Sequence, residues 1–314
     1  MKNLTSGQKF YNGDLKKRYI TECSKDLHVN YSYIEKCFSM TAEYEEDYGK
    51  DLCDWTVYEI TEYYKMLNVT SLEILLTRNS LFSMYTQFCL ENNLVNDNQN
   101  HYLECKKEVL NGCINKAMLS KMIVDRETVL SWVEELPNAR DQFIILSLFE
   151  YGTSKEFRDI VNAKPEDISG NKLKLSNRTV DISDELIEVV EDCINQQEYF
   201  SISETYKKVT ILNDYGYILK SYPNQKRDSS SYQKGRNVYQ ACQRIFKYLD
   251  IGDWMSANAI AESGKLSMIK EKAAELNMTP VDYIFSDNLK EVEKQFDSNI
   301  VRSIYVEKYK EYLV

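Results

Sequence analysis

Residues able to carry acid–base or nucleophilic chemistry are scarce in the second half of this chain. Histidine occurs only at His28 and His101, and the eight cysteines include no Cys-x-x-Cys pair. The sequence has no glycine-rich phosphate loop and no metal-ligand spacing, so we expect neither a cofactor nor a metal. Tyr305 could attack a phosphate, but a phenol with a pKa near ~10 needs an activating base. Because the chain has 24 tyrosines, a packing role for Tyr305 on a last amphipathic helix is the simpler interpretation.

A basic segment interrupts an otherwise acidic chain. Residues 206–249 hold nine basic and two acidic residues, a net charge of +7, whereas the whole chain of 314 residues carries −10. Within this segment, residues 220–236 mix Lys and Arg with Ser, Asn, Gln and Tyr, which are side chains that contact phosphates and base edges. The segment is our leading candidate for a DNA contact, and a solvated loop between helices is the alternative. The acidic remainder argues against indiscriminate binding to DNA.

The elements before the basic segment follow from periodicity and turn residues. Residues 141–149 form an apolar run of the length of a buried helix, and a turn follows at residues 151–154. Apolar residues at helical spacing over 157–163 predict a short helix, which Pro165 ends. Alternating apolar and polar residues at 172–175 and 178–182 then predict the two strands of a β-hairpin.

This order of elements resembles the start of the catalytic domain of tyrosine recombinases, the phage integrase family. Upstream, residues 56–67 and 71–91 resemble the family's helical core-binding domain, and each segment opens with a predicted capping box. Downstream, a helix around residues 238–249 and a tyrosine near the C-terminus follow the family's order. The resemblance implies a mainly α fold with a small β-hairpin or sheet. The domains we expect are an N-terminal helical segment at 1–50, a core-binding domain at 51–118 and an integrase-like catalytic-fold domain at 119–314.

The residues that the family uses for catalysis look replaced. The family places an arginine in the turn and short helix after the buried helix, where it holds the scissile phosphate. In this chain Glu156 takes that place and would repel a phosphate. The family's His-x-x-Arg cluster is matched by Asn258 and Ala261, and neither can act as an acid, a base or a phosphate clamp. We therefore expect a protein that is not an enzyme, with Tyr305 as a remnant of the nucleophile.

Basic side chains near the places where DNA lies in the family are the candidate DNA contacts. Arg178 stands on the predicted hairpin, and Lys155 and Arg158 flank the place of the lost arginine. Residues 16–18, Lys-Lys-Arg, are either a further phosphate contact or a plain surface patch. The candidate DNA-binding residues are Arg78, Lys155, Arg158, Arg178, Lys220, Lys226, Arg227, Lys234, Arg236 and Arg244.

Three functions are compatible with the sequence. The first is a sequence-specific DNA-binding regulator, because a degenerate integrase scaffold resembles the integrase-like master lysogeny repressors of SPbeta-type phages. That resemblance implies double-stranded operator DNA as the partner, a homodimer, an antagonist protein that relieves repression, and a location on the nucleoid in the bacterial cytoplasm. The second is an active recombinase whose catalytic arginines lie elsewhere. The third is a helical protein-interaction module, which the acidity and the apolar stripe Ile284, Leu289, Val292 and Phe296 favour.

Composition and local signals complete the expectations. The first residues lack an apolar core of signal-peptide length, and no run is long enough to cross a membrane, so we expect a cytoplasmic protein. Most cysteines lie in apolar helical faces and are expected to be reduced. The acidic cluster at residues 43–47 is predicted to be a solvated helix face. Thr279 followed by Pro280 predicts a helix start.

Overall fold

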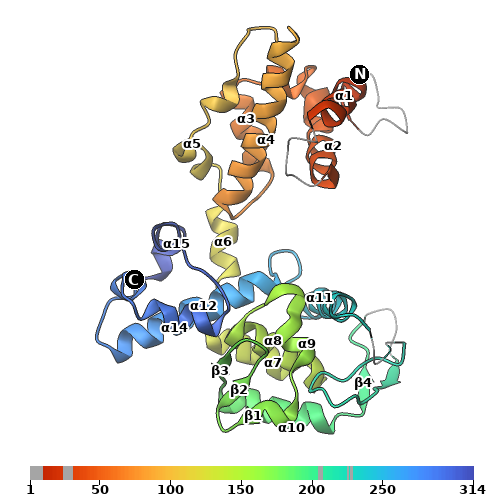
Figure 1. The fold of residues 1–314 in the computed structure, drawn as a ribbon, viewed down its shortest axis with the longest axis vertical. Helices are drawn as coiled ribbons and strands as arrows, with labels where there is room; N and C mark the ends of the chain where they lie inside the picture. Colours follow the sequence, from red (N-terminus) through yellow and green to blue (C-terminus); the bar gives the residue numbers. More distant parts are fainter. Residues whose placement is uncertain (1–9, 24–30, 204–207, 225, 227–228) are drawn as a thin grey trace. The chain divides into compact units, whose positions relative to one another are not determined.

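The fold consists of two compact units, each with its own hydrophobic core (Figure 1). The computed structural model describes residues 10–23, 31–203, 208–224, 226 and 229–314. The N-terminal unit is Met1–Leu119, and the C-terminal unit is Ser120–Val314. Both are mainly helical, with small sheets in the C-terminal unit, as the sequence predicts. In the part of the chain that the structure describes, no helix is long and apolar enough to cross a membrane.

The N-terminal unit packs its helices around an aromatic core. Phe38 of α2 and Tyr85 of α4 meet edge to face with ring centroids 5.0 Å apart, and Tyr19 of α1 contacts Tyr85 at 5.2 Å. The first two helices therefore share one core with α3 and α4, whereas the sequence suggested a separate segment up to residue 50. The elements are α1 (Gly13–Cys23), α2 (Tyr31–Tyr48), η1 (Leu52–Asp54), α3 (Val57–Met66), α4 (Leu72–Glu91), η2 (His101–Leu103), α5 (Lys107–Asn111) and α6 (Lys116–Met122), which crosses the boundary between the units.

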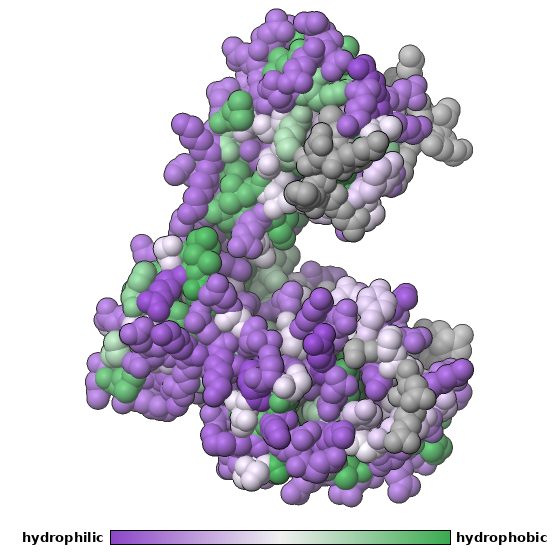
Figure 2. All heavy atoms as spheres, in the orientation of Figure 1, coloured by the Kyte–Doolittle hydropathy of each residue, from purple (hydrophilic) through white to green (hydrophobic). Residues whose placement is uncertain are grey.

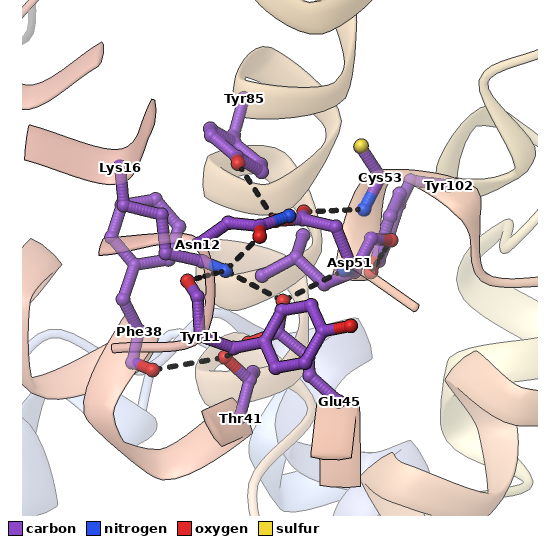
Figure 3. A network of polar contacts seen from close by, with 11 residues as sticks. Tyr11, Asn12, Lys16, Phe38, Thr41, Glu45, Asp51, Cys53, Tyr85 and Tyr102 are labelled. Atoms are coloured by element: carbon purple, nitrogen blue, oxygen red, sulfur yellow. Dashed lines mark hydrogen bonds and ion pairs between the residues drawn. The ribbon is translucent and has the colours of Figure 1, made fainter. Parts of the chain in front are cut away.

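A buried polar network ties α1 to the rest of this unit (Figure 3). The ammonium of Lys16 is fully buried and lies 2.6 Å from Glu45 Oε1 and 3.1 Å from Asp51 Oδ2. The Thr41 hydroxyl also donates to Glu45, and the Tyr85 hydroxyl donates to Asp51. Lys16 is therefore no surface patch or phosphate contact, and the prediction of a solvated acidic cluster is wrong for Glu45. The burial of Lys16 and of Glu45 was not predicted from the sequence, because their partners lie far away along the chain.

Helix starts follow the predicted capping residues in two of three cases. The capping box between Thr56 and Glu59 at the start of α3 is confirmed, and Thr279 caps α13 with Pro280 at its first turn. The predicted box at the start of α4 is wrong, because Ser71 is the N-cap and its side chain makes no capping hydrogen bond. Seven cysteines in the described part of the chain are free and buried.

The C-terminal unit contains the predicted hairpin within a three-stranded antiparallel sheet in the order β1-β2-β3. Leu173 pairs with Val180 across the hairpin, and both are buried on its inner face. A second sheet pairs β4 with β5. The elements are α7 (Arg126–Glu135), α8 (Ala139–Tyr151), η3 (Lys155–Phe157), α9 (Arg158–Asn162), η4 (Pro165–Asp167), β1 (Ile168–Ser169), β2 (Lys172–Lys174), β3 (Thr179–Asp181), α10 (Asp184–Asn195), β4 (Glu198–Phe200), β5 (Val209–Ile211), α11 (Ser231–Tyr248), α12 (Ala257–Glu275), α13 (Pro280–Phe285), α14 (Leu289–Gln295), α15 (Arg302–Tyr309) and η5 (Lys310–Tyr312).

Helix α8 is the predicted buried helix and forms the centre of this unit. Helices α7, α10, α11 and α12 all pack against it. The closest approach is at Gly264 of α12, where an added Cβ would lie 1.7 Å from the carbonyl oxygen of Phe149. Only a glycine lets the two backbones come this close. The crossing of α8 and α12 therefore depends on this one residue.

The buried network yields a prediction for Lys16. Replacing Lys16 with Met should lower the free energy of unfolding of the N-terminal unit by about 3–5 kcal/mol, because Glu45 and Asp51 would remain buried without their cation. Lys17→Met, at an exposed position of the same helix, should change it by less than about 0.5 kcal/mol. Hydrogen exchange of peptides from α2, measured by mass spectrometry, reports the difference. Equal protection in the two variants would contradict the role assigned to Lys16.

A second prediction concerns pH. Burial raises the pKa of Glu45 above its usual value, although Lys16 opposes this shift. Because the folded-state pKa exceeds the unfolded one, the contribution of Glu45 to stability is full below the unfolded pKa and is lost as pH rises through the folded pKa. Hydrogen exchange of α2 should thus show lower stability at about pH 8 than at about pH 5. The drop should be smaller in Glu45→Gln, and an equal drop would contradict the assignment.

Candidate nucleic-acid interface

The turn after α8 is where the predicted loss of the catalytic arginine can be examined. Gly152 ends α8 with φ of 88°, and Glu156 in η3 has a left-handed backbone with φ of 59°. Helix α11 lies directly on this turn, since a Cβ added to Gly235 would be 2.1 Å from the carbonyl oxygen of Glu156. The structure therefore brings the start of α11, which belongs to the basic segment, against the position that Glu156 occupies.

Arg178, a candidate DNA contact, is a buried anchor. Its Nη1 lies 2.8 Å from Asp159 Oδ2, and both side chains are 4% exposed. Its other nitrogens donate to the carbonyl oxygens of Tyr151 and Gln295, each at 3.3 Å. This one guanidinium thus joins the hairpin to the end of α8, to α9 and to the end of α14. In the structure its donors are used inside the protein.

Lys220, another candidate DNA contact, also uses its donors inside the protein. Its ammonium donates to the carbonyl oxygens of Ile194 and Gln196, the latter at 2.9 Å, and so caps the C-terminus of α10. Its own carbonyl oxygen accepts a bond of 3.0 Å from the Nε of Arg140. Arg140 is 2% exposed and stacks its guanidinium 4.5 Å from the ring centroid of Tyr222. This cluster fixes the path of the chain that leads into α11.

The remaining candidate DNA contacts differ in how exposed their side chains are. Lys155, Arg158, Lys226 and Arg236 have exposed side chains. Lys234 is half-buried with its ammonium 4.5 Å from the centroid of Tyr217. The half-buried Arg244 has its Nη2 3.5 Å from the Tyr222 hydroxyl, and Arg78, half-buried in the N-terminal unit, has its Nη2 3.8 Å from Met40 Sδ. Arg227 lies outside the described residues.

Three of the four exposed candidates lie on elements that contact one another. Helix α11 packs against both η3 and α9, so Arg236 lies on an element in contact with those that carry Lys155 and Arg158. Arg158 also lines a pocket of about 270 Å³ together with Lys174 of β2, Ser176 and Asn162, but Asp159 and Asp167 line it as well. Cations, hydroxyls and amides bind phosphate oxygens, whereas the two carboxylates disfavour an anion inside this pocket. The arrangement can hold a polyanion along the surface of η3, α9 and α11.

Helix α11 presents further polar groups that the sequence analysis did not single out. Tyr232 and Tyr239 are 65% and 52% exposed, and Gln243 donates to the Tyr239 hydroxyl at 3.2 Å. Together with Arg236, these residues recur at intervals of three or four and so share one face of the helix. That spacing was visible in the sequence and could have identified the face. On the side of the molecule seen in Figure 2, the surface is largely hydrophilic, with apolar atoms in small groups.

The candidate nucleophile lies away from solvent. Tyr305 in α15 is 8% exposed, with its ring 4.7 Å from that of Tyr309. Burial, reinforced by the carboxylate of Glu262, raises the pKa of Tyr305 well above its usual value. Of the other degenerate positions, Asn258 is exposed in the first turn of α12, and Ala261 is buried in that helix.

The ring of Phe296 packs against the turn after α8. A Cβ added to Gly152 would lie 3.1 Å from its ring. Gln295 beside it donates to the carbonyl oxygen of Glu150 at 2.9 Å and accepts from the amide of Asp181 at 3.0 Å. Phe296 and Gln295 therefore pack the end of α14 against the end of α8 and the hairpin.

The burial of Arg178 yields a third prediction. Arg178→Gln should lower the free energy of unfolding of the C-terminal unit by about 3–5 kcal/mol, because Asp159 would remain buried without its cation. Lys174→Gln, at an exposed position on the neighbouring strand, should change it by less than about 0.5 kcal/mol. Hydrogen exchange of peptides from α8 and β3 distinguishes the two variants. A stable Arg178→Gln protein that has lost only affinity for DNA would instead restore Arg178 as a DNA contact.

Comparison with known proteins fits this architecture. The family model described as MrpR, C-terminal catalytic domain, matches residues 123–313, and that described as MrpR, N-terminal core-binding domain, matches residues 10–91. Among solved structures, the crystal structure of XerA recombinase aligns with 96% of this chain and 98% of that chain, at 11% sequence identity and a TM-score of 0.40. No curated protein sequence matches. The expected fold class, a helical core-binding domain followed by a recombinase-like catalytic-fold domain, is confirmed. The chain belongs to the MrpR family.

Proposed function

We propose that this protein is a sequence-specific DNA-binding regulator of transcription, of the phage lysogeny repressor type, that lacks recombination chemistry. The observation that carries the proposal is the packing of α11 on Glu156, which places Arg236 on an element in contact with those bearing Lys155 and Arg158. Lys155 and Arg158 flank Glu156 in the sequence, and Arg236 follows the glycine of α11 that packs on the Glu156 backbone. Such a surface can hold the DNA backbone, but it offers little to stabilise a reacting phosphate.

The absence of catalysis is part of the proposal and is supported by two positions. Glu156 would repel a phosphate, and Tyr305 is buried with a raised pKa. A phenol that does not ionise readily cannot attack phosphorus efficiently. The alternative of an active recombinase would require a rearrangement that exposes Tyr305 and brings other arginines beside it.

The partner of the proposed regulator is double-stranded operator DNA. Exposed cations gathered on η3, α9 and α11 of a chain whose net charge is −10 should give binding that is steeply salt-dependent and selective. A homodimer would suit a repeated or palindromic operator, and an antagonist protein would relieve repression. The second copy in the homodimer and the antagonist protein are both implications of the repressor hypothesis.

The experiment that tests the function is recovery of DNA fragments by the full-length protein from sheared DNA of its own genome. The bound fragments are sequenced with and without a denaturing wash. A few intergenic sites that wash away under denaturation are the expected result. Adducts that survive the wash and disappear in Tyr305→Phe would establish a recombinase, and no enrichment would leave the protein-interaction alternative.

A charge-reversal variant tests the assigned surface and is our fourth prediction. Lys155→Glu, Arg158→Glu and Arg236→Glu together should weaken binding to the recovered site at least about 100-fold and make the slope of log K against log salt less steep by about 3. Lys270→Glu, Lys290→Glu and Lys310→Glu, a set with the same charge change at other exposed positions, should retain most of the affinity. Equal losses in both variants would mean that total charge, rather than this surface, determines binding.

A further inference from the structure

The pocket beside α9 and the β2–β3 hairpin has side chains of both charges in its walls. Its volume of about 270 Å³ lies just below the range of pockets that hold drug-sized molecules. The polar part of its lining comes from α9, η4 and the hairpin, and consists of Arg158, Asp159, Asn162, Asp167, Lys174 and Ser176. The pocket therefore has room for one small molecule, and it offers that molecule two cations, two carboxylates, an amide and a hydroxyl.

Most of these polar groups have no partner inside the protein. Asp159 is the exception, because its carboxylate lies 2.8 Å from Nη1 of Arg178 and its side chain is 4% exposed. Within the described part of the chain, the other five side chains make no hydrogen bond and no ion pair, although they line one pocket. The walls thus hold charges of opposite sign too far apart to neutralise each other. A molecule placed between them can contact both signs of charge.

The charges of the walls favour a zwitterion. A simple anion would be attracted by Arg158 and Lys174 and repelled by Asp159 and Asp167, and a simple cation would meet the reverse. A molecule that carries an ammonium and a carboxylate on neighbouring atoms satisfies both signs of charge at once. Leu175, which is buried, adds an apolar part to the wall, against which a small aliphatic group can pack.

We propose that this pocket binds a free α-amino acid. The carboxylate of the ligand binds Arg158 and Lys174, and its ammonium binds Asp167, the carboxylate that has no partner inside the protein. A longer peptide is disfavoured, because its two terminal charges lie too far apart to enter one pocket of this size. The inference rests on the proposed function in one respect: Arg158 also belongs to the proposed DNA surface, so a bound amino acid competes with DNA for this guanidinium and weakens operator binding.

The test is saturation-transfer NMR of the full-length protein with each standard amino acid in turn at about 10 mM, which detects even millimolar affinity. At least one amino acid should bind saturably. Its N-acetyl derivative lacks the ammonium and its amide lacks the carboxylate, so each should bind at least about tenfold more weakly. Equal binding of the blocked derivatives, no binding by any amino acid, or tighter binding of inorganic phosphate than of any amino acid would overturn the inference.

Variants test whether the amino acid occupies this pocket. Lys174→Gln and Asp167→Asn should each weaken its binding at least about tenfold, because each removes one charge that the ligand needs. Lys172→Gln and Glu166→Gln make the same chemical changes at exposed positions that do not line the pocket, and should retain the affinity. Since Lys174 is exposed, loss of binding in its variant does not reflect misfolding. Affinity that is unchanged in both pocket variants would overturn the assignment.

Operator DNA separates this inference from the proposed function. A saturating concentration of the amino acid should weaken binding to the recovered operator at least about threefold, and an unchanged affinity would overturn the competition for Arg158. Amino-acid binding by a protein that recovers no operator would support the pocket and count against the proposed function. Operator binding by a protein that binds no amino acid would do the reverse.

Discussion

The buried ion pair between Arg178 and Asp159 is the constraint on which the C-terminal unit depends. A charge this deep is tolerated only when its donors are satisfied, and the guanidinium meets this condition by also binding the carbonyl oxygens of Tyr151 and Gln295. The end of α8, α9, the hairpin and the end of α14 are thereby fixed at one point. The turn after α8 has its conformation because the hairpin and the end of α14 hold it from both sides.

With that turn fixed, the replacement of a catalytic arginine at Glu156 that we propose would not disturb the scaffold. Helix α11 packs on the backbone carbonyl of Glu156, through Gly235, and does not need an arginine side chain at that position. The same holds for the crossing of α8 and α12, which depends on Gly264 and the backbone of Phe149. Such contacts require a glycine on one helix, but they place no requirement on the side chain of the residue whose carbonyl oxygen the glycine approaches. A recombinase-like fold can therefore retain its DNA-facing elements after its catalytic residues have changed.

Periodicity and turn residues predicted α8, the hairpin and the helix starts at Thr56 and Thr279, because these depend on neighbours within a few residues. The roles of Lys16, Arg178 and Lys220 were not predictable in this way. Each looks like a surface cation in sequence, and each is buried because a main partner lies well outside the local window: Asp159 is 19 residues from Arg178, Gln196 is 24 from Lys220, and Glu45 is 29 from Lys16. A local sequence pattern does not identify which of the 39 Lys and Arg residues will have such distant partners in the fold.

The separation of charge explains how an acidic protein with the proposed function could be selective for DNA. At physiological ionic strength charges act over about 8 Å, so the basic α11 region would attract DNA only at contact, while the acidic remainder of the chain would repel it elsewhere. A DNA segment would therefore gain affinity only where its backbone lies against η3, α9 and α11 together.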